Sequence, residues 1–232
     1  MNADEQRNEN EKMKIIITGA TGMIGEGILL ASLYHPNITE VLMVNRRASP
    51  LKHPKLSELI VKDFTDLAGY SAKLTGYDGC FYCAGISSFG MKEQKYNFIT
   101  FYTTIMFAKE LARFNSNMVF FYLSGVYADS SENGKIMWAR IKGKTENALK
   151  ELHFKAAYSF RPGFIIPLKA QKNVRLIYKG LNLIYPFVFP NKTLTYDEIG
   201  TALMRTLTLG YNKNILEIKD LKLIARQSKL YK

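Results

Sequence analysis

Short runs of apolar residues alternate along the chain with longer segments in which apolar positions recur every three or four residues. The continuous runs are typical of strands buried on both faces, and they cover residues 14–18, 41–44, 59–61, 80–83, 118–123 and 157–160. The helical pattern is clearest over residues 23–34, 93–114 and 136–152. Strands that alternate with helices in this way favour a parallel sheet covered on both faces. We therefore expect an α/β domain with a doubly wound, mostly parallel sheet of about seven strands.

The two ends of the chain depart from this pattern. Residues 1–12 are polar and acidic, and we expect a disordered tail without a secretory signal. Residues 13–232 are long enough for one well-buried core, so one domain is the default. Beyond residue 167 the pattern loosens, apart from a helical stretch over 196–209, and predicts a small C-terminal lobe over 167–232. Segment 174–192 in this lobe is oily and basic, a composition compatible with contact to a membrane surface.

Composition and charge narrow the possible partners. The chain has 232 residues with 32 Lys and Arg against 20 Asp and Glu, a formal charge of +12, which favours an anionic partner such as a phosphorylated cofactor. The basic residues form no long block, so we expect no nucleic-acid partner. No apolar run approaches the roughly 20 residues of a membrane span, and we expect no integral membrane segment. With only two cysteines and no disulfide framework, a cytoplasmic location is expected.

Several residues that suggest other functions have structural explanations. Cys80 and Cys83 have the spacing of a redox or zinc motif, but in a strand residues three apart point to opposite faces. The three histidines lie in separate segments, so no metal site is expected. The aromatic residues of 96–107 suggest a platform on which nucleic-acid bases stack, but their helical period suits a core face better.

The strongest motif follows the first strand. In the run Thr18-Gly19-Ala20-Thr21-Gly22-Met23-Ile24-Gly25, glycines recur at every third position between a strand and a helix. Missing side chains let the backbone turn sharply and approach a pyrophosphate, and the helix N-terminus offers free N–H groups and a favourable dipole. This context predicts a Rossmann-type domain that binds a dinucleotide.

The end of the second strand bears on the choice of cofactor. An NAD-specific site usually places Asp or Glu there for the ribose 2′-hydroxyl, whereas this chain has Asn45, Arg46 and Arg47. Two guanidinium groups suit a 2′-phosphate, which favours NADP(H) over NAD(H). The alternative is that both arginines only solvate a loop.

Over residues 14–210 the sequence resembles the short-chain dehydrogenase/reductase superfamily, in particular its extended and atypical members of nucleoside-diphosphate-sugar epimerase type. The resemblance implies that Asp63-Phe64 flanks the adenine, that Cys83-Ala84-Gly85 lies along the cofactor, and that Arg161-Pro162-Gly163 closes over its nicotinamide end. Residues 129–132 and 137–149 resemble a bacterial group related to Tat-interacting-protein-type oxidoreductases.

The resemblance also bears on two segments outside these motifs. It implies that the region after the sixth strand, with segment 174–192, forms the substrate lid, and contact of this segment with a membrane surface is the minor alternative. It further implies that the helix with the aromatic residues of 96–107 lies at a possible homodimer interface.

The same resemblance implies an active site with one altered residue. The family uses Ser or Thr after the fifth strand and Tyr-x-x-x-Lys on the next helix; Ser124 and Lys142 match, but Trp138 takes the place of the tyrosine. In the family the tyrosine transfers the proton while the lysine lowers its pKa and binds the nicotinamide ribose. An indole N–H donates a hydrogen bond but transfers no proton near neutral pH.

Three interpretations follow from this substitution. In the first, Ser124 and Lys142 hold the cofactor while another group such as Tyr127 supplies the proton. In the second, the protein binds NADPH without turnover and acts as a redox sensor or scaffold through a protein partner. In the third, Trp138 is a core residue and the helix is shifted in the alignment. For an enzyme, a small carbonyl compound or a sugar-type molecule is the expected substrate.

Overall fold

The computed structural model describes residues 11–174, 180–181 and 184–227, so most of the predicted N-terminal tail and part of segment 174–192 lie outside the described residues. Seven strands form one parallel sheet in the order β3-β2-β1-β4-β5-β6-β9. They are β1 (Met13–Thr18), β2 (Ile38–Asn45), β3 (Leu56–Ile60), β4 (Gly79–Tyr82), β5 (Val119–Leu123), β6 (Ala156–Arg161) and β9 (Ile215–Glu217). The α/β, doubly wound class expected from the sequence is confirmed.

The strand order reverses between β1 and β4, which pair in parallel with Thr18 opposite Tyr82. At such a switch point the loops that follow the two strands diverge to opposite faces of the sheet and leave a crevice at the carboxyl ends of the strands. The glycine turn follows β1, and the segment from Cys83 follows β4. The sheet therefore brings two of the predicted cofactor segments to one place.

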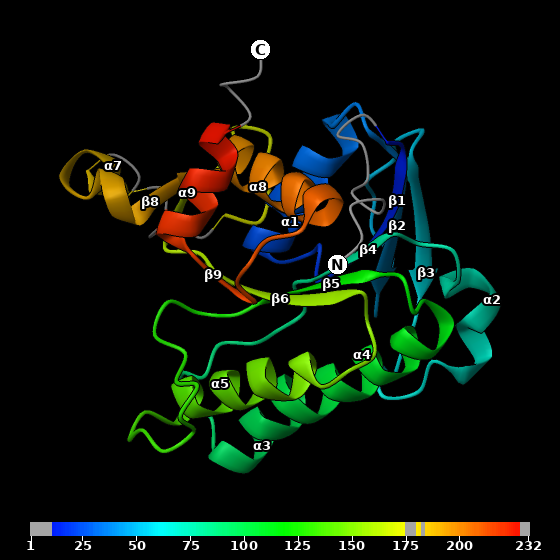
Figure 1. Ribbon diagram of the computed structural model, residues 1–232, viewed down its shortest axis with the longest axis horizontal. Helices are drawn as coiled ribbons and strands as arrows, with labels where there is room; N and C mark the ends of the chain where they lie inside the picture. Colours follow the sequence, from blue (N-terminus) through cyan, green and yellow to red (C-terminus); the bar gives the residue numbers. More distant parts are fainter. Residues whose placement is uncertain (1–10, 175–179, 182–183, 228–232) are drawn as a thin grey trace.

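Helices cover both faces of the sheet (Figure 1). One layer contains α1 (Met23–Tyr34), α8 (Tyr196–Leu209) and α9 (Ile218–Gln227); the other contains α3 (Glu93–Asn97), α4 (Thr103–Phe114) and α5 (Met137–Lys150). A π-helical turn, η3 (Phe98–Tyr102), joins α3 to α4. Two short helices follow β3: η2 (Ala68–Tyr70) and α2 (Ser71–Leu74).

Each face of the sheet has its own apolar core. Ile15 and Ile17 of β1 belong to the core beneath α1 and α8, whereas Ile16 belongs to the core beneath α4 and α5. Cys80 and Cys83 divide in the same way, one in each core, and both thiols are free. Burial raises the pKa of the Cys83 thiol to about 12 and raises the pKa of the Cys80 thiol as well. Both are therefore unreactive core residues. The expected placement of the two sulfurs on opposite faces of the sheet is confirmed.

The C-terminal part, from residue 167 on, packs more closely against the sheet than a separate lobe would. Its helix α8 crosses α1 where the Tyr196 ring lies against Gly27, and a side chain at Gly27 would collide with that ring. Its last strand, β9, extends the main sheet beside β6. The elements outside the two layers are a small parallel sheet of β7 (Phe164–Ile166) and β8 (Thr193–Thr195), with α7 (Tyr185–Val188) and η4 (Pro190–Lys192) before β8.

Over the described residues, no helix is long and apolar enough to cross a membrane.

Candidate functional site

Two glycines of the turn after β1 are required by packing. Gly19 has a positive φ of 68°, and a Cβ there would lie 2.5 Å from the Cys83 carbonyl oxygen and the Ala84 nitrogen. A Cβ at Gly25 would collide with the carbonyl oxygen of Gly19. The turn is therefore folded tightly onto the β4 segment, and Ala84 N–H also donates to Thr18 Oγ1 at 3.2 Å.

Gly22 is different, because the protein itself does not need a glycine there. Its φ of −92° and ψ of 161° suit any residue, and a Cβ would meet only the Gly19 carbonyl oxygen, at 3.4 Å. Gly22 is the exposed N-cap of α1, and the first intrahelical hydrogen bond runs from Glu26 N–H to the Gly22 carbonyl, at 2.8 Å. The bare backbone beside the N–H groups of Met23 and Ile24 fits a diphosphate, with Thr21 exposed at its edge.

The end of β2 presents both arginines to solvent. Arg46 and Arg47 are exposed, whereas Asn45 is buried. An acid that the sequence pattern did not indicate, Glu58 on β3, accepts from the Ser49 backbone N–H at 2.8 Å and from Asn45 Nδ2 at 3.4 Å. Glu58 therefore shapes the arginine loop from the neighbouring strand.

The predicted adenine-flanking pair is split by the structure. Asp63 is exposed, and hydrogen bonds from the backbone N–H and hydroxyl of Thr65, at 2.8 and 2.7 Å, lower the pKa of its carboxyl. The Phe64 side chain is buried against Phe107, with ring centroids 5.2 Å apart. Of this pair, only the Asp63 side chain is accessible from outside the protein.

Ser124, Trp138 and Lys142 meet at the carboxyl end of β5. A Cβ at Gly125 would lie 3.3 Å from the Trp138 ring and 3.6 Å from Lys142 Cδ, so the two side chains, one helical turn apart on α5, lie over the same residue. The Ser124 side-chain oxygen is buried and has no hydrogen-bond partner among the described residues. Such a hydroxyl is satisfied by a bound ligand group or water.

Lys142 occupies an environment that disfavours its charge. Its Nζ donates to the Leu123 carbonyl at 3.2 Å and lies 5.2 Å from the centre of the Tyr122 ring. Burial lowers the pKa of Lys142 to about 8, with Glu146 acting in the opposite direction. Tyr127, by contrast, is 72% exposed. The structure thus places Lys142 beside the Trp138 ring at the end of β5 and leaves the Tyr127 side chain exposed.

Arg161 has a partner that the sequence pattern did not reveal. Its guanidinium forms a bidentate ion pair with Glu146, which is fully buried, with Nε donating to Oε1 at 2.9 Å. Nη2 also donates to Ser130 Oγ at 3.0 Å. The Arg161 side chain therefore links β6 to α5 instead of facing the crevice. Pro162 is buried, and Gly163 lies tightly against Ile218, so these two residues would contribute backbone alone.

A second set of contacts fixes the segment after β7 to the first turn of α1. The Glu26 carboxylate accepts from the backbone N–H groups of Lys172, at 2.9 Å, and Asn173, at 2.8 Å. Gln171 Nε2 donates to the Met23 carbonyl at 2.6 Å. This Glu26 latch couples the predicted diphosphate turn to the start of the predicted lid. This contact could hardly be predicted from the sequence, because a single acid such as Glu26 in the first turn of a helix is common.

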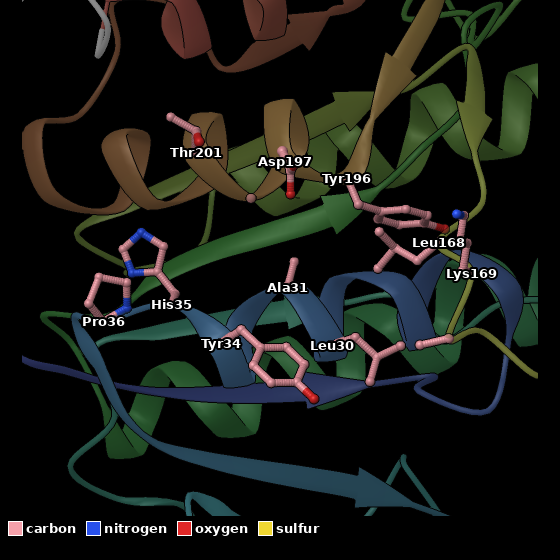
Figure 2. Close-up of a pocket in the computed structure, with 12 residues that line it drawn as sticks. Leu30, Ala31, Tyr34, His35, Pro36, Leu168, Lys169, Tyr196, Asp197 and Thr201 are labelled. Atoms are coloured by element: carbon pink, nitrogen blue, oxygen red, sulfur yellow. The ribbon is translucent and has the colours of Figure 1, made fainter.

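A groove of about 650 Å³ lies between α1 and α8, away from the predicted residues. In Figure 2, Ala31 of α1 and Asp197 of α8 point toward each other, with Leu168 and Lys169 at one end of the groove and His35 and Pro36 at the other. Leu30, Tyr34 and Thr201 also line the groove. The groove contains none of the glycine-turn, arginine or Ser124 side chains. Across the residues that the structure describes, no three His, Cys, Asp or Glu side chains gather into a group that could hold a metal ion.

The strand order, the switch point and the glycine turn define a nicotinamide-dinucleotide-binding Rossmann domain of short-chain dehydrogenase/reductase type. The chain belongs to the NAD-dependent epimerase/dehydratase family, whose sequence profile matches residues 15–145. Its fold is similar to that of the Bordetella bronchiseptica enzyme WbmF, solved in complex with NAD+, with a TM-score of 0.62 at 15% identity over 95% of this chain and 79% of that one. The resemblance found in the sequence is confirmed at the level of the superfamily.

Two relatives refine this placement. The chain is 28% identical over 161 residues to the protein fmp52-1, mitochondrial, of Aspergillus terreus, covering 65% of this chain and 66% of that protein. It is 26% identical over 165 residues to the protein HTATIP2 of Rattus norvegicus, covering 67% of this chain and 64% of that protein. The match thus spans just under two thirds of each relative's length.

These relatives correct one expectation. The sequence suggested a cytoplasmic protein, but fmp52 relatives from Aspergillus terreus, Emericella nidulans and Aspergillus oryzae are named mitochondrial, which contradicts that expectation. Cysteine usage separates oxidising from reducing compartments and does not distinguish among the reducing ones.

Proposed function

We propose that this chain binds NADP(H) in preference to NAD(H), with the diphosphate over Gly22. The observation that carries the proposal is the bare, exposed backbone at Gly22, where the protein's own packing does not require a glycine. Arg46 and Arg47 stand exposed where an NAD-specific site has an acid, and guanidinium groups suit a 2′-phosphate.

Titration of the natural protein with NADPH and NADH tests this preference. A charge-assisted hydrogen bond contributes about 1.5–3 kcal/mol, so NADPH is expected to bind about tenfold more tightly or better. The double substitution Arg46→Ala and Arg47→Ala should remove the difference and leave NADH affinity nearly unchanged. Lys73→Ala, an exposed cation on α2, is the matched control. Equal or weaker binding of NADPH by the natural protein contradicts the preference.

For the reaction, we propose an oxidoreductase or epimerase-type enzyme in which Lys142 replaces the usual tyrosine as proton donor. The bound nicotinamide supplies the hydride. Lys142, with its pKa near 8, is held by the Leu123 carbonyl and is poised to protonate a substrate carbonyl oxygen, after which solvent restores its proton. The unpartnered Ser124 hydroxyl donates a hydrogen bond to the same oxygen. The substrate class is a small carbonyl compound or a sugar-type molecule.

The second candidate is a non-catalytic NADPH-binding protein that acts as a redox sensor or scaffold through a partner. Trp138 favours it, because the family resemblance aligns this residue with the tyrosine that donates the proton, and an indole N–H transfers no proton near neutral pH.

A cofactor-oxidation screen over carbonyl compounds separates the two candidates. Turnover by the natural protein that Lys142→Met abolishes supports the enzyme. Turnover that appears only in Trp138→Tyr supports the binding protein, since the substitution would then restore a missing donor.

We further propose a homodimer through the face of α4 and η3. The Phe98 and Tyr102 side chains are 55% and 44% exposed and stack with ring centroids 5.3 Å apart. Light scattering should give twice the chain mass, and Phe98→Glu should give the monomer; a monomeric natural protein contradicts the proposal.

A further inference from the structure

Four exposed apolar side chains gather at α7 and the residues beside it. Ile184, Phe187, Val188 and Phe189 are 67%, 83%, 57% and 44% exposed, and we call this set the α7 crown. In Figure 1, α7 projects at the end of the molecule opposite β3 and α2. Scattered apolar residues are ordinary on a protein surface, but neighbouring ones at a projecting tip indicate an interaction surface.

The chain's own packing holds the crown outward. The Tyr185 ring packs between Phe164 of β7 and Phe189, with ring centroids 4.7 and 5.0 Å apart. Both backbone polar groups of Phe189 form hydrogen bonds. Its N–H donates to the Tyr185 carbonyl at 2.8 Å, and its carbonyl accepts from Thr193 Oγ1 at 2.9 Å. The aromatic ring that anchors α7 therefore faces inward, and Phe187 is left facing solvent.

Two lysines lie beside the Phe189 end of the crown. Lys192 Nζ lies 5.6 Å from the centre of the Phe189 ring, and Lys222 Nζ of α9 donates to the Pro190 carbonyl at 2.6 Å. Along the sequence, residues 167–192 contain no Asp or Glu, and their cations are Lys169, Lys172, Arg175, Lys179 and Lys192. An apolar tip with lysines at its base and no acid in the same stretch complements an anionic surface with an apolar interior.

We propose that the α7 crown inserts into the surface of an anionic lipid bilayer. Aromatic and branched side chains enter the boundary between headgroups and acyl chains, while the Lys192 and Lys222 ammonium groups remain at the level of the lipid phosphates. This is peripheral, reversible binding, and it requires neither the proposed cofactor nor the proposed reaction.

Vesicle co-sedimentation of the full chain tests the proposal, with phosphatidylcholine alone and with added phosphatidylserine. The natural protein should bind the mixed vesicles more tightly. Phe187→Ser should weaken that binding about tenfold because it removes a side chain that becomes partly buried. Lys192→Gln with Lys222→Gln should cost about fivefold per lysine on the mixed vesicles and little on phosphatidylcholine. Matched controls are Phe89→Ser, at a side chain 95% exposed elsewhere, and Lys73→Gln with Lys150→Gln.

Three outcomes would overturn the proposal: no binding of the natural protein to mixed vesicles, equal losses in the controls, or unchanged vesicle binding in Phe187→Ser. A different result would assign the crown to a protein interface. If neither the natural protein nor any variant binds vesicles, and light scattering shows a dimer that only Phe187→Ser dissociates, the crown is a contact between two copies of this chain. Circular dichroism melting of each variant verifies that it is folded.

Discussion

The buried ion pair between Glu146 and Arg161 gives the largest stability effect that we expect from a single isosteric change. Glu146 is fully buried and accepts two hydrogen bonds from Arg161, whose side chain is 9% exposed. Glu146→Gln keeps the shape but removes the buried counter-charge, and the guanidinium then keeps only the half-exposed Glu217 carboxylate, 3.9 Å from Nη1. The carboxylate raises the pKa of Arg161, so the arginine stays charged at every pH at which the protein is handled.

Breaking one partner of a buried pair typically costs about 3–5 kcal/mol. The amide oxygen of glutamine still accepts one bond, so we expect the lower end, about 3 kcal/mol. For a domain of this size each kcal/mol shifts Tm by about 2–4 °C, which gives a decrease of about 6–12 °C. Thermal and urea unfolding measure it.

A matched double substitution separates charge from shape. Glu146→Leu with Arg161→Met removes both charges and should recover most of the lost stability, because well-packed apolar residues replace such pairs at little cost. A loss below about 1 kcal/mol in Glu146→Gln, or a double variant no more stable than the single one, would refute this reasoning.

Two further predictions concern residues beside the candidate site. Lys142→Met should stabilise the protein at pH 7, because the folded state lowers the pKa of Lys142 from the ordinary 10.5 to about 8. The cost of burying the charged lysine is full below pH 8 and vanishes as the pH rises to 10.5. The gain in Tm on substitution should therefore shrink by pH 10. A gain independent of pH would contradict that cause. Glu26→Ala should release the segment after β7, so that trypsin cleaves faster after Lys169 and Lys172; cleavage as slow as in the natural protein would show that the Glu26 latch holds nothing.

The sequence predicted the repeating part of the fold well. The helices expected over residues 23–34 and 196–209 have the bounds of α1 and α8. The amphipathic period of α8 carries its own signal, whereas α1 is apolar on most of its surface and is located by the glycine turn before it. The three-residue strands β7, β8 and β9 are too short to show any period. The helix expected over 93–114 is divided by the π-helical turn η3, which was not predicted from the sequence.

For the candidate site, contiguous motifs were visible and paired contacts were not. The glycine turn is a run of neighbours, so its chemistry can be inferred from spacing alone. Glu26 and Lys172 are 146 residues apart, and Glu146 and Arg161 come from a helix and a strand. Only the fold brings these pairs together, and the second pair changes the expected role of Arg161.

The central claim is that the bare backbone at Gly22 receives the diphosphate of a nicotinamide dinucleotide. Gly22→Leu adds a side chain where the backbone angles accept one, and replacing a glycine N-cap costs the fold about 1 kcal/mol or less. Gly25→Ala is the contrasting variant, since its Cβ would collide with the Gly19 carbonyl and should destabilise folding itself. Titration of folded Gly22→Leu with NADPH should show at least a tenfold loss of affinity; an affinity equal to that of the natural protein would contradict the claim.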